Sequence, residues 1–196
     1  MTQLGWTVRR LGAATCTLML ALSACSLTGA SHPKRALMPP DQAVTKMNAL
    51  LDDLMSGIKP PLRYWDDWPR ADEQTSGLTD RSKGFATASR ERHVMTKVAS
   101  AKYGFLMDMV ERSWKAKGYR ITSVNPNQLT MYASTADGSS VDMTIGAAGN
   151  ITFGVGVSPI PVIRDHDPFG TPTPVPTMSN GNPDVIPKYD DPFWSN

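Results

Sequence analysis

Apolar residues recur at helical spacing in two parts of the chain. The first stretch stops at a glycine and a proline pair, and it predicts a helix over 42–56 with Asp41 as its N-cap. The second stretch has an apolar face from Tyr103 to Trp114, with Ser100 placed to cap it. Each stretch keeps its apolar residues on one side, so we expect two amphipathic helices that cover one surface.

Shorter segments with strand-like composition surround the second helix. Two precede it, at 62–65 and within 85–98, and the polar stretch 66–83 between them is expected to be a loop. Four follow it, over 119–124, 129–135, 140–146 and 151–157, with Asp137-Gly138 and Gly149-Asn150 as hairpin turns. The pattern predicts an α+β domain over 41–158 with two layers. Two helices cover one face of a mostly antiparallel sheet, in the order α-β-β-α-β-β-β-β.

The segments on either side of this domain lack apolar periodicity. Residues 25–40 end in a proline pair and are expected to form a tether. Residues 159–196 hold nine of the 16 prolines, which disfavours sheet pairing and predicts an extended tail. The last residues of this tail are aromatic again and are candidates for docking on the domain.

The first 24 residues have the three-part pattern of an export signal. Residues 1–10 carry two positive charges, Arg9 and Arg10, and residues 11–24 are mostly apolar or small. A helix of this apolar length covers about 21 Å, which is short of a bilayer core of about 30 Å. We therefore expect a cleaved signal peptide over 1–24 rather than a membrane-spanning helix.

The signal ends in Leu22-Ser23-Ala24-Cys25, one aliphatic residue and two small residues before a cysteine. This pattern resembles the lipobox of bacterial lipoproteins. The resemblance implies that the Cys25 sulfur receives a diacylglyceryl group and that a signal peptidase cuts between Ala24 and Cys25. Two acyl chains hold a protein on a membrane where one holds it only marginally. We expect a protein anchored through Cys25 to the extracytoplasmic face of the cell membrane.

A wider similarity covers the second half of the chain. A helix that ends in Trp114, the segment GYRITSV over 118–124 and three hairpin strands are similar to small actinobacterial envelope lipoproteins of unassigned role. Those proteins often close the domain with a cysteine pair, whereas Cys16 and Cys25 both precede the domain here. The similarity supports the α+β fold and implies no activity.

The charge of the chain argues against a nucleic-acid partner. The formal net charge is +2, and the first 24 residues contain two basic residues and no acidic one. The remainder therefore carries 18 basic and 18 acidic residues. Binding to phosphate backbones needs a clear basic excess, which this neutral domain lacks.

Residues suited to catalysis or metal binding are few. None of the three histidines lies at helical spacing from another, and the chain has no nucleophile motif or phosphate-binding loop. Asp165, His166 and Asp167 are adjacent, but neighbouring side chains of an extended segment point to opposite sides. We expect no catalytic residues, no metal and no cofactor.

The segment RYWDDWPR, Arg63–Arg70, is the candidate ligand surface. Trp65 and Trp68 flank Asp66 and Asp67. Aromatic faces stack on sugar rings and carboxylates accept hydrogen bonds from sugar hydroxyls, although such rings also pack into protein cores.

Three functions remain open. The first is a non-catalytic binding module for a cell-wall glycan or an envelope protein. The second is a hydrolase of envelope polymer that uses carboxylates such as Asp66 or Asp67. The third is a structural or assembly accessory protein of the envelope.

Overall fold

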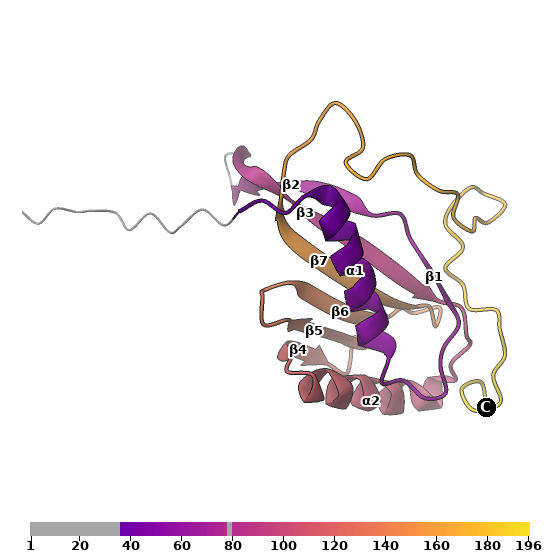
Figure 1. Ribbon diagram of the computed structural model, residues 1–196. Helices are drawn as coiled ribbons and strands as arrows, with labels where there is room; N and C mark the ends of the chain where they lie inside the picture. Colours follow the sequence, from indigo (N-terminus) through magenta and orange to yellow (C-terminus); the bar gives the residue numbers. More distant parts are fainter. Residues whose placement is uncertain (1–35, 78–79) are drawn as a thin grey trace, which may run out of the picture. The chain divides into compact units, whose positions relative to one another are not determined.

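Two α-helices and seven strands make up the part of the chain that the computed structural model describes, residues 36–77 and 80–196 (Figure 1). The helices are α1, Pro40–Met55, and α2, Tyr103–Ala116, and a short 3-10 helix, η2, precedes α2 at Ser100–Lys102. The expected attachment residue Cys25 and the cleavage site after Ala24 lie outside the described residues.

The strands form one antiparallel sheet in the order β1-β3-β7-β6-β5-β4, and β2 also pairs with β3. Their bounds are β1 Tyr64–Asp66, β2 Arg70–Ser76, β3 Arg81–Val94, β4 Arg120–Asn125, β5 Thr130–Ser134, β6 Ser140–Ile145 and β7 Ile151–Ile160. The strands after α2 pair as consecutive hairpins, and β7 then joins them to β3. The predicted α+β class is confirmed, with its elements in the expected order.

The expectation of a loop over 66–83 is wrong in part, because this segment contains β2 and the start of β3. β2 reads RADEQTS and is exposed or half-buried along its whole length. It pairs with residues 81–89 of β3, where Ala86 and Ala88 are buried in the core, but no side chain of β2 itself is buried, so β2 does not require apolar residues. A strand of this kind lacks the alternation from which strands are predicted.

Both helices begin differently from the prediction. α1 starts at Pro40, since the fixed φ of proline suits the first turn, and Asp41 lies inside that turn rather than at the N-cap. Its carboxylate is still favourably placed near the helix N-terminus. Ser100 belongs to η2, and the N-cap of α2 is Lys102, which makes no side-chain capping bond.

Both helices pack on the same face of the sheet and share one core. α1 crosses β7 and β3, as Figure 1 shows, whereas α2 contacts β4 and α1. The Trp114 indole lies at the centre of this core and donates a hydrogen bond of 3.1 Å to the Leu54 carbonyl, which joins the two helices. The apolar faces predicted for both helices are the faces that are buried.

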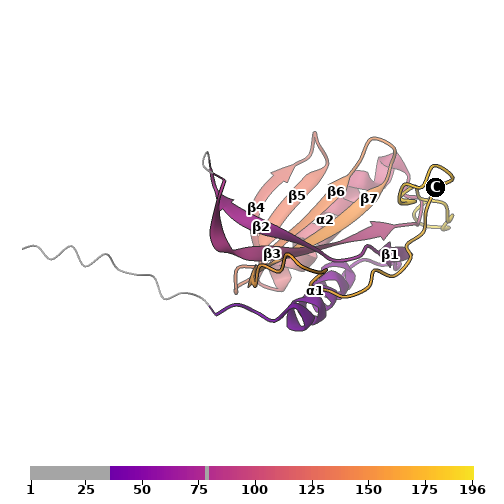
Figure 2. The ribbon, with the colours of Figure 1, turned by 90° about the horizontal axis from the view of Figure 1, so that it is seen from above.

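The opposite face of the sheet, here called the open face, carries none of the described helices. In β7, Ile151, Phe153, Val155 and Val157 are buried in the core. The alternation of a strand therefore turns Thr152, Gly154 and Gly156 towards the open face. Figure 2 shows α1 along one side of the sheet, and the open face is the side away from it.

The C-terminal tail follows the β1 edge of the sheet and closes the domain (Figure 1). Tyr189 forms a parallel bridge with Thr96, just after β3. Further along, the Trp194 side chain is fully buried, and its indole donates a hydrogen bond of 2.9 Å to the Pro60 carbonyl. The tail therefore contributes one of the largest core side chains of the domain.

Candidate functional site

In the first half of the predicted ligand segment, the side chains of Trp65 and Asp66 lie on opposite sides of the sheet. Trp65 packs on His93 on the open face, with ring centroids 4.5 Å apart, and its indole donates to the Asp184 carbonyl of the tail at 3.0 Å. Asp66 points the other way and accepts two hydrogen bonds from Arg92, at 2.5 Å and 2.8 Å. Consecutive strand residues face opposite sides, so these two side chains do not converge on one ligand.

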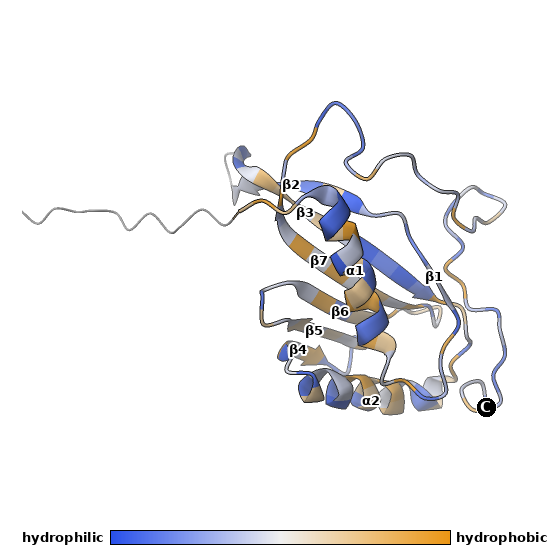
Figure 3. Ribbon diagram, viewed as in Figure 1, coloured by the Kyte–Doolittle hydropathy of each residue, from blue (hydrophilic) through white to orange (hydrophobic). Residues whose placement is uncertain are grey.

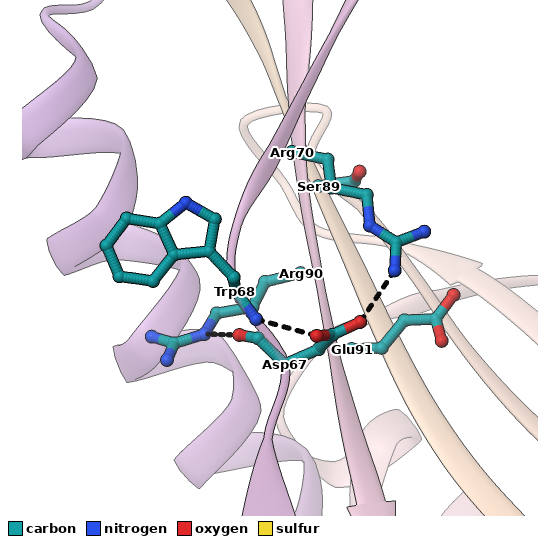
Figure 4. A pocket seen from close by; sticks show the side chains of 6 residues that line it. All are labelled: Asp67, Trp68, Arg70, Ser89, Arg90 and Glu91. Atoms are coloured by element: carbon teal, nitrogen blue, oxygen red, sulfur yellow. Dashed lines mark hydrogen bonds and ion pairs between the residues drawn. The ribbon is translucent and has the colours of Figure 1, made fainter. Parts of the chain in front are cut away.

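The second half of the segment surrounds a small polar hollow (Figure 4). The Asp67 carboxylate is buried and accepts hydrogen bonds of 2.8 Å from Arg70 and from the Trp68 backbone N–H, while Arg90 donates to the Asp67 carbonyl. The hollow measures about 30 Å³, which is room for a small number of water molecules. It is too small for a sugar ring.

The Trp68 indole lies outside this hollow. Figure 4 shows its ring turned away from Arg70 and Glu91, and its N–H donates to Asp167 Oδ2 at 3.0 Å. Trp65 and Trp68 are both half-buried and hold two separate parts of the tail. The four predicted site residues, Trp65, Asp66, Asp67 and Trp68, therefore all have partners within the described chain.

A different group of residues meets on the open face, where one register row crosses four strands. Gly154 in β7 pairs with Glu91 in β3 on one side and with Asp142 in β6 on the other, and Asp142 pairs in turn with Tyr132 in β5. A β-carbon at position 154 would overlap with Asp142 Oδ1. The absence of a side chain at Gly154 therefore lets the Asp142 carboxylate lie flat across the neighbouring strand.

Asp142 differs from the other residues of this row because its carboxyl group has a strongly raised pKa. It makes no hydrogen bond or ion pair within the described part of the chain. Burial, and secondly the nearby charge of Glu91, raise the pKa of Asp142 to about 6. At neutral pH the domain therefore holds a partly desolvated carboxylate beside a second carboxylate.

Aromatic and hydroxyl groups surround Asp142. The Tyr132 side chain is 47% exposed, which is the largest exposure among the bulky apolar and aromatic residues of the described chain. Ser140 and Thr144 flank Asp142 on the same side of β6, and the Ser140 hydroxyl lies over Gly156 as Asp142 lies over Gly154. The open face thus combines acceptors, hydroxyls and one exposed ring.

His93 borders this row and is buried on the open face beneath Trp65. Burial lowers the pKa of His93, although the nearby charge of Glu91 opposes this effect. Its Nδ1 lies 3.4 Å from the Thr152 hydroxyl. A neutral imidazole at this position fits a structural role, in which His93 packs against Trp65 on the open face.

The sequence contains one signal for this site, two glycines inside a strand. Gly154 and Gly156 alternate with apolar residues inside a predicted strand, FGVGV, and glycine in a strand marks close approach of another group. The partners of these glycines are distant in sequence, so the signal does not name them.

Comparison with protein-family models, with curated proteins and with solved structures finds no match for this chain. Within residues 36–77 and 80–196, no three histidine, cysteine or acidic side chains come together to hold a metal ion. Neither α-helix of that part has the length and apolarity needed to cross a bilayer.

Proposed function

We propose that this protein is a lipid-anchored, non-catalytic binding module of the cell envelope, and that it binds a cell-wall glycan through the open face. The lipobox Leu22–Cys25 supports the anchor and the extracytoplasmic location. The observation that carries the binding function is Asp142, a carboxylate that has no partner in the described chain and lies beside an exposed aromatic ring.

The chemistry of the open face suits a sugar. Sugar hydroxyls donate hydrogen bonds to carboxylates, and charge-assisted hydrogen bonds of this kind are about twice as strong as neutral ones. The apolar face of a sugar ring packs on an aromatic side chain, which Tyr132 offers at the adjacent register position. A ligand would thus supply the hydrogen bonds that Asp142 lacks within the domain.

A sedimentation assay tests the proposal. The full chain, purified in detergent, is mixed with insoluble cell-wall polysaccharide, and the bound fraction is measured against polymer concentration. Asp142→Asn should weaken binding about tenfold, since a hydrogen bond to a charged group contributes about 1.5–3 kcal/mol. Tyr132→Ala should weaken binding comparably, and Gly154→Ala should do so by displacing the carboxylate.

Two matched variants control for general effects of the same substitutions. Asp108→Asn removes a carboxylate from the exposed surface of α2, and Tyr189→Ala removes a ring that is 41% exposed on the tail. Both should bind like the parent chain. The proposal would be contradicted if the parent chain did not bind the polymer. It would also be contradicted if all five variants bound the polymer as strongly as the parent chain does.

One observation favours a second candidate function, a hydrolase of envelope polymer. A carboxyl group with a raised pKa that faces a second carboxylate is the arrangement by which glycoside hydrolases pair an acid with a base or nucleophile. Asp142 would then be the proton donor and Glu91 the base. Release of reducing ends by the parent chain, and its loss in Glu91→Gln, would favour this function over simple binding.

A further inference from the structure

A second hollow lies on the helix side of the sheet, where α1 ends and the chain turns into β1. It measures about 260 Å³, and its floor is apolar while one end is charged. The lining residues are Met55, Ile58, Pro61, Leu62, Tyr64 and Arg92, with Asp52, Ser56 and Lys59 at the rim. None of these residues belongs to the open face.

Arg92 is held rigidly at the charged end. Its side chain is 3% exposed, Asp66 accepts hydrogen bonds from its Nε and Nη2, and the Tyr64 ring lies 3.8 Å from its Cζ. Burial alone would lower the pKa of Arg92, but hydrogen bonding to Asp66 and the charge of that residue outweigh burial and raise it. The guanidinium is therefore a fixed, permanently charged donor. Figure 3 shows that β3, the strand to which Arg92 belongs, has a hydrophilic stretch beside α1.

One edge of this guanidinium is left without a hydrogen bond. Arg92 Nη1 is buried and has no hydrogen-bond partner among the residues that the structure describes. Asp52 Oδ1 lies 2.9 Å from this atom and helps to raise the pKa of Arg92, but the pair is an ion pair that does not meet hydrogen-bond geometry. A buried charged donor without a well-aligned acceptor is costly, so an acceptor that enters the hollow would be favoured.

The residues beside Nη1 permit such an acceptor. The Asp52 side chain is 67% exposed, so it can turn into water at little cost. Lys59 is exposed at the rim, and its ammonium group has no ion pair among the described side chains. The hollow therefore presents donors at one end of an apolar floor.

We propose that this hollow binds a small carboxylate with an apolar body. The ligand carboxylate takes the place of Asp52 against Arg92 Nη1 and lies within reach of the Lys59 ammonium. The apolar body packs on Met55, Ile58 and Leu62, which lie on the floor. This site is separate from the glycan site proposed above, and either can fail without the other.

Methyl NMR on the full chain in detergent tests the site directly, because Met55 lines the hollow. The chain is labelled with ¹³C at the methionine methyl groups and titrated with hexanoate, with Met131 and Met143 in the sheet core as internal references. Hexanoate should shift the Met55 methyl signal with a Kd of about 1 mM. This affinity corresponds to a typical binding free energy per non-hydrogen atom for so small a ligand. The two reference signals should stay in place.

Hexan-1-ol and hexylamine have the same apolar body without the negative charge. If either shifts Met55 as strongly as hexanoate does, the assignment of a carboxylate site is wrong. If hexanoate leaves Met55 unshifted, the hollow is not a ligand site. A parallel titration with N-acetyl-leucine separates the two sources of this chemistry, since tighter binding than hexanoate indicates a peptide C-terminus and weaker binding a free aliphatic acid.

Two variants test the roles of the rim residues. Asp52→Asn removes the competing carboxylate and should tighten hexanoate binding about threefold, the size expected for one exposed ion pair. Lys59→Ala should weaken it by a similar factor. Lys188→Ala, which removes an exposed lysine of the tail, should leave it unchanged. Equal affinity in all three variants would overturn the proposed geometry.

Discussion

At the scale of single residues, the Asp142 carboxylate on the open face lowers the stability of the folded domain at neutral pH. Its carboxylate lies over Gly154, has no partner in the described chain and faces the charge of Glu91. A raised pKa means that the folded state binds the Asp142 proton more tightly than the unfolded state does. Residues that cost stability in this way are typical of binding and catalytic sites.

The pKa of Asp142 predicts how stability changes with pH. Its pKa is about 6 in the folded state against an ordinary value of 3.8, so between these values the folded state holds more protons. Stability should therefore fall as pH rises from about 4 to about 6, by up to about 3 kcal/mol for this residue. Asp142→Asn should remove this loss and raise the free energy of unfolding at pH 7. Urea unfolding from pH 4 to pH 7 measures both effects.

Asp108→Asn is the matched control for this measurement, because Asp108 is exposed on α2. It should leave the free energy of unfolding within about 0.5 kcal/mol of the parent at every pH. If Asp142→Asn lowered stability at pH 7, the Asp142 carboxylate would be making a favourable interaction, and the binding proposal would lose its main support.

At the scale of elements, the C-terminal tail is the part that completes the domain. Trp65 and Trp68 each donate an indole hydrogen bond to it, and Lys97 pairs with Asp190 at 3.1 Å. Its Trp194 fills the core beside Pro60. The tail has no regular secondary structure after β7, yet it supplies apolar burial that a small domain needs.

Trp194→Ala should destabilise the domain by about 3–5 kcal/mol, because it leaves a large cavity and an unpaired Pro60 carbonyl. Guanidinium unfolding followed by circular dichroism measures this loss. Ile186→Ala changes another tail residue, but one that is 44% exposed, and it should cost less than about 0.5 kcal/mol. Similar small effects in both variants would show that the tail is not part of the cooperative unit.

At the scale of the whole molecule, the described domain is joined to an N-terminal segment that carries the expected lipid anchor. The described chain begins before α1, and the tail ends at the opposite end of the domain (Figures 1 and 2).

Cys25→Ser should abolish metabolic labelling with a radioactive fatty acid and slow removal of the signal peptide, because serine is a much weaker nucleophile than a thiolate. The variant should also leave the membrane fraction when the membranes are washed. Cys16→Ser changes the other cysteine and should label, mature and fractionate like the parent chain. Unchanged membrane retention of Cys25→Ser would mean that the apolar segment itself spans the membrane.

The sequence by itself determined the features that depend on neighbouring residues. The two helix faces, the hairpins after α2 and the fold class follow from spacing and turn residues, and the structure confirms them. The lipobox pattern is equally local and stays a prediction. The helix starts differ because proline suits the first turn of α1 and η2 precedes α2.

Only the tertiary structure decided what meets on the sheet. Glu91, Asp142 and Gly154 form one row because β7 joins β3 to the hairpin strands, and no local pattern specifies that order. The same applies to Arg92, which α1 and β1 surround from both sides. β2 was not predicted because none of its side chains is buried, so it lacks the apolar alternation from which strands are predicted. Long-range pairing brings these groups together, and spacing along one sequence carries no record of it.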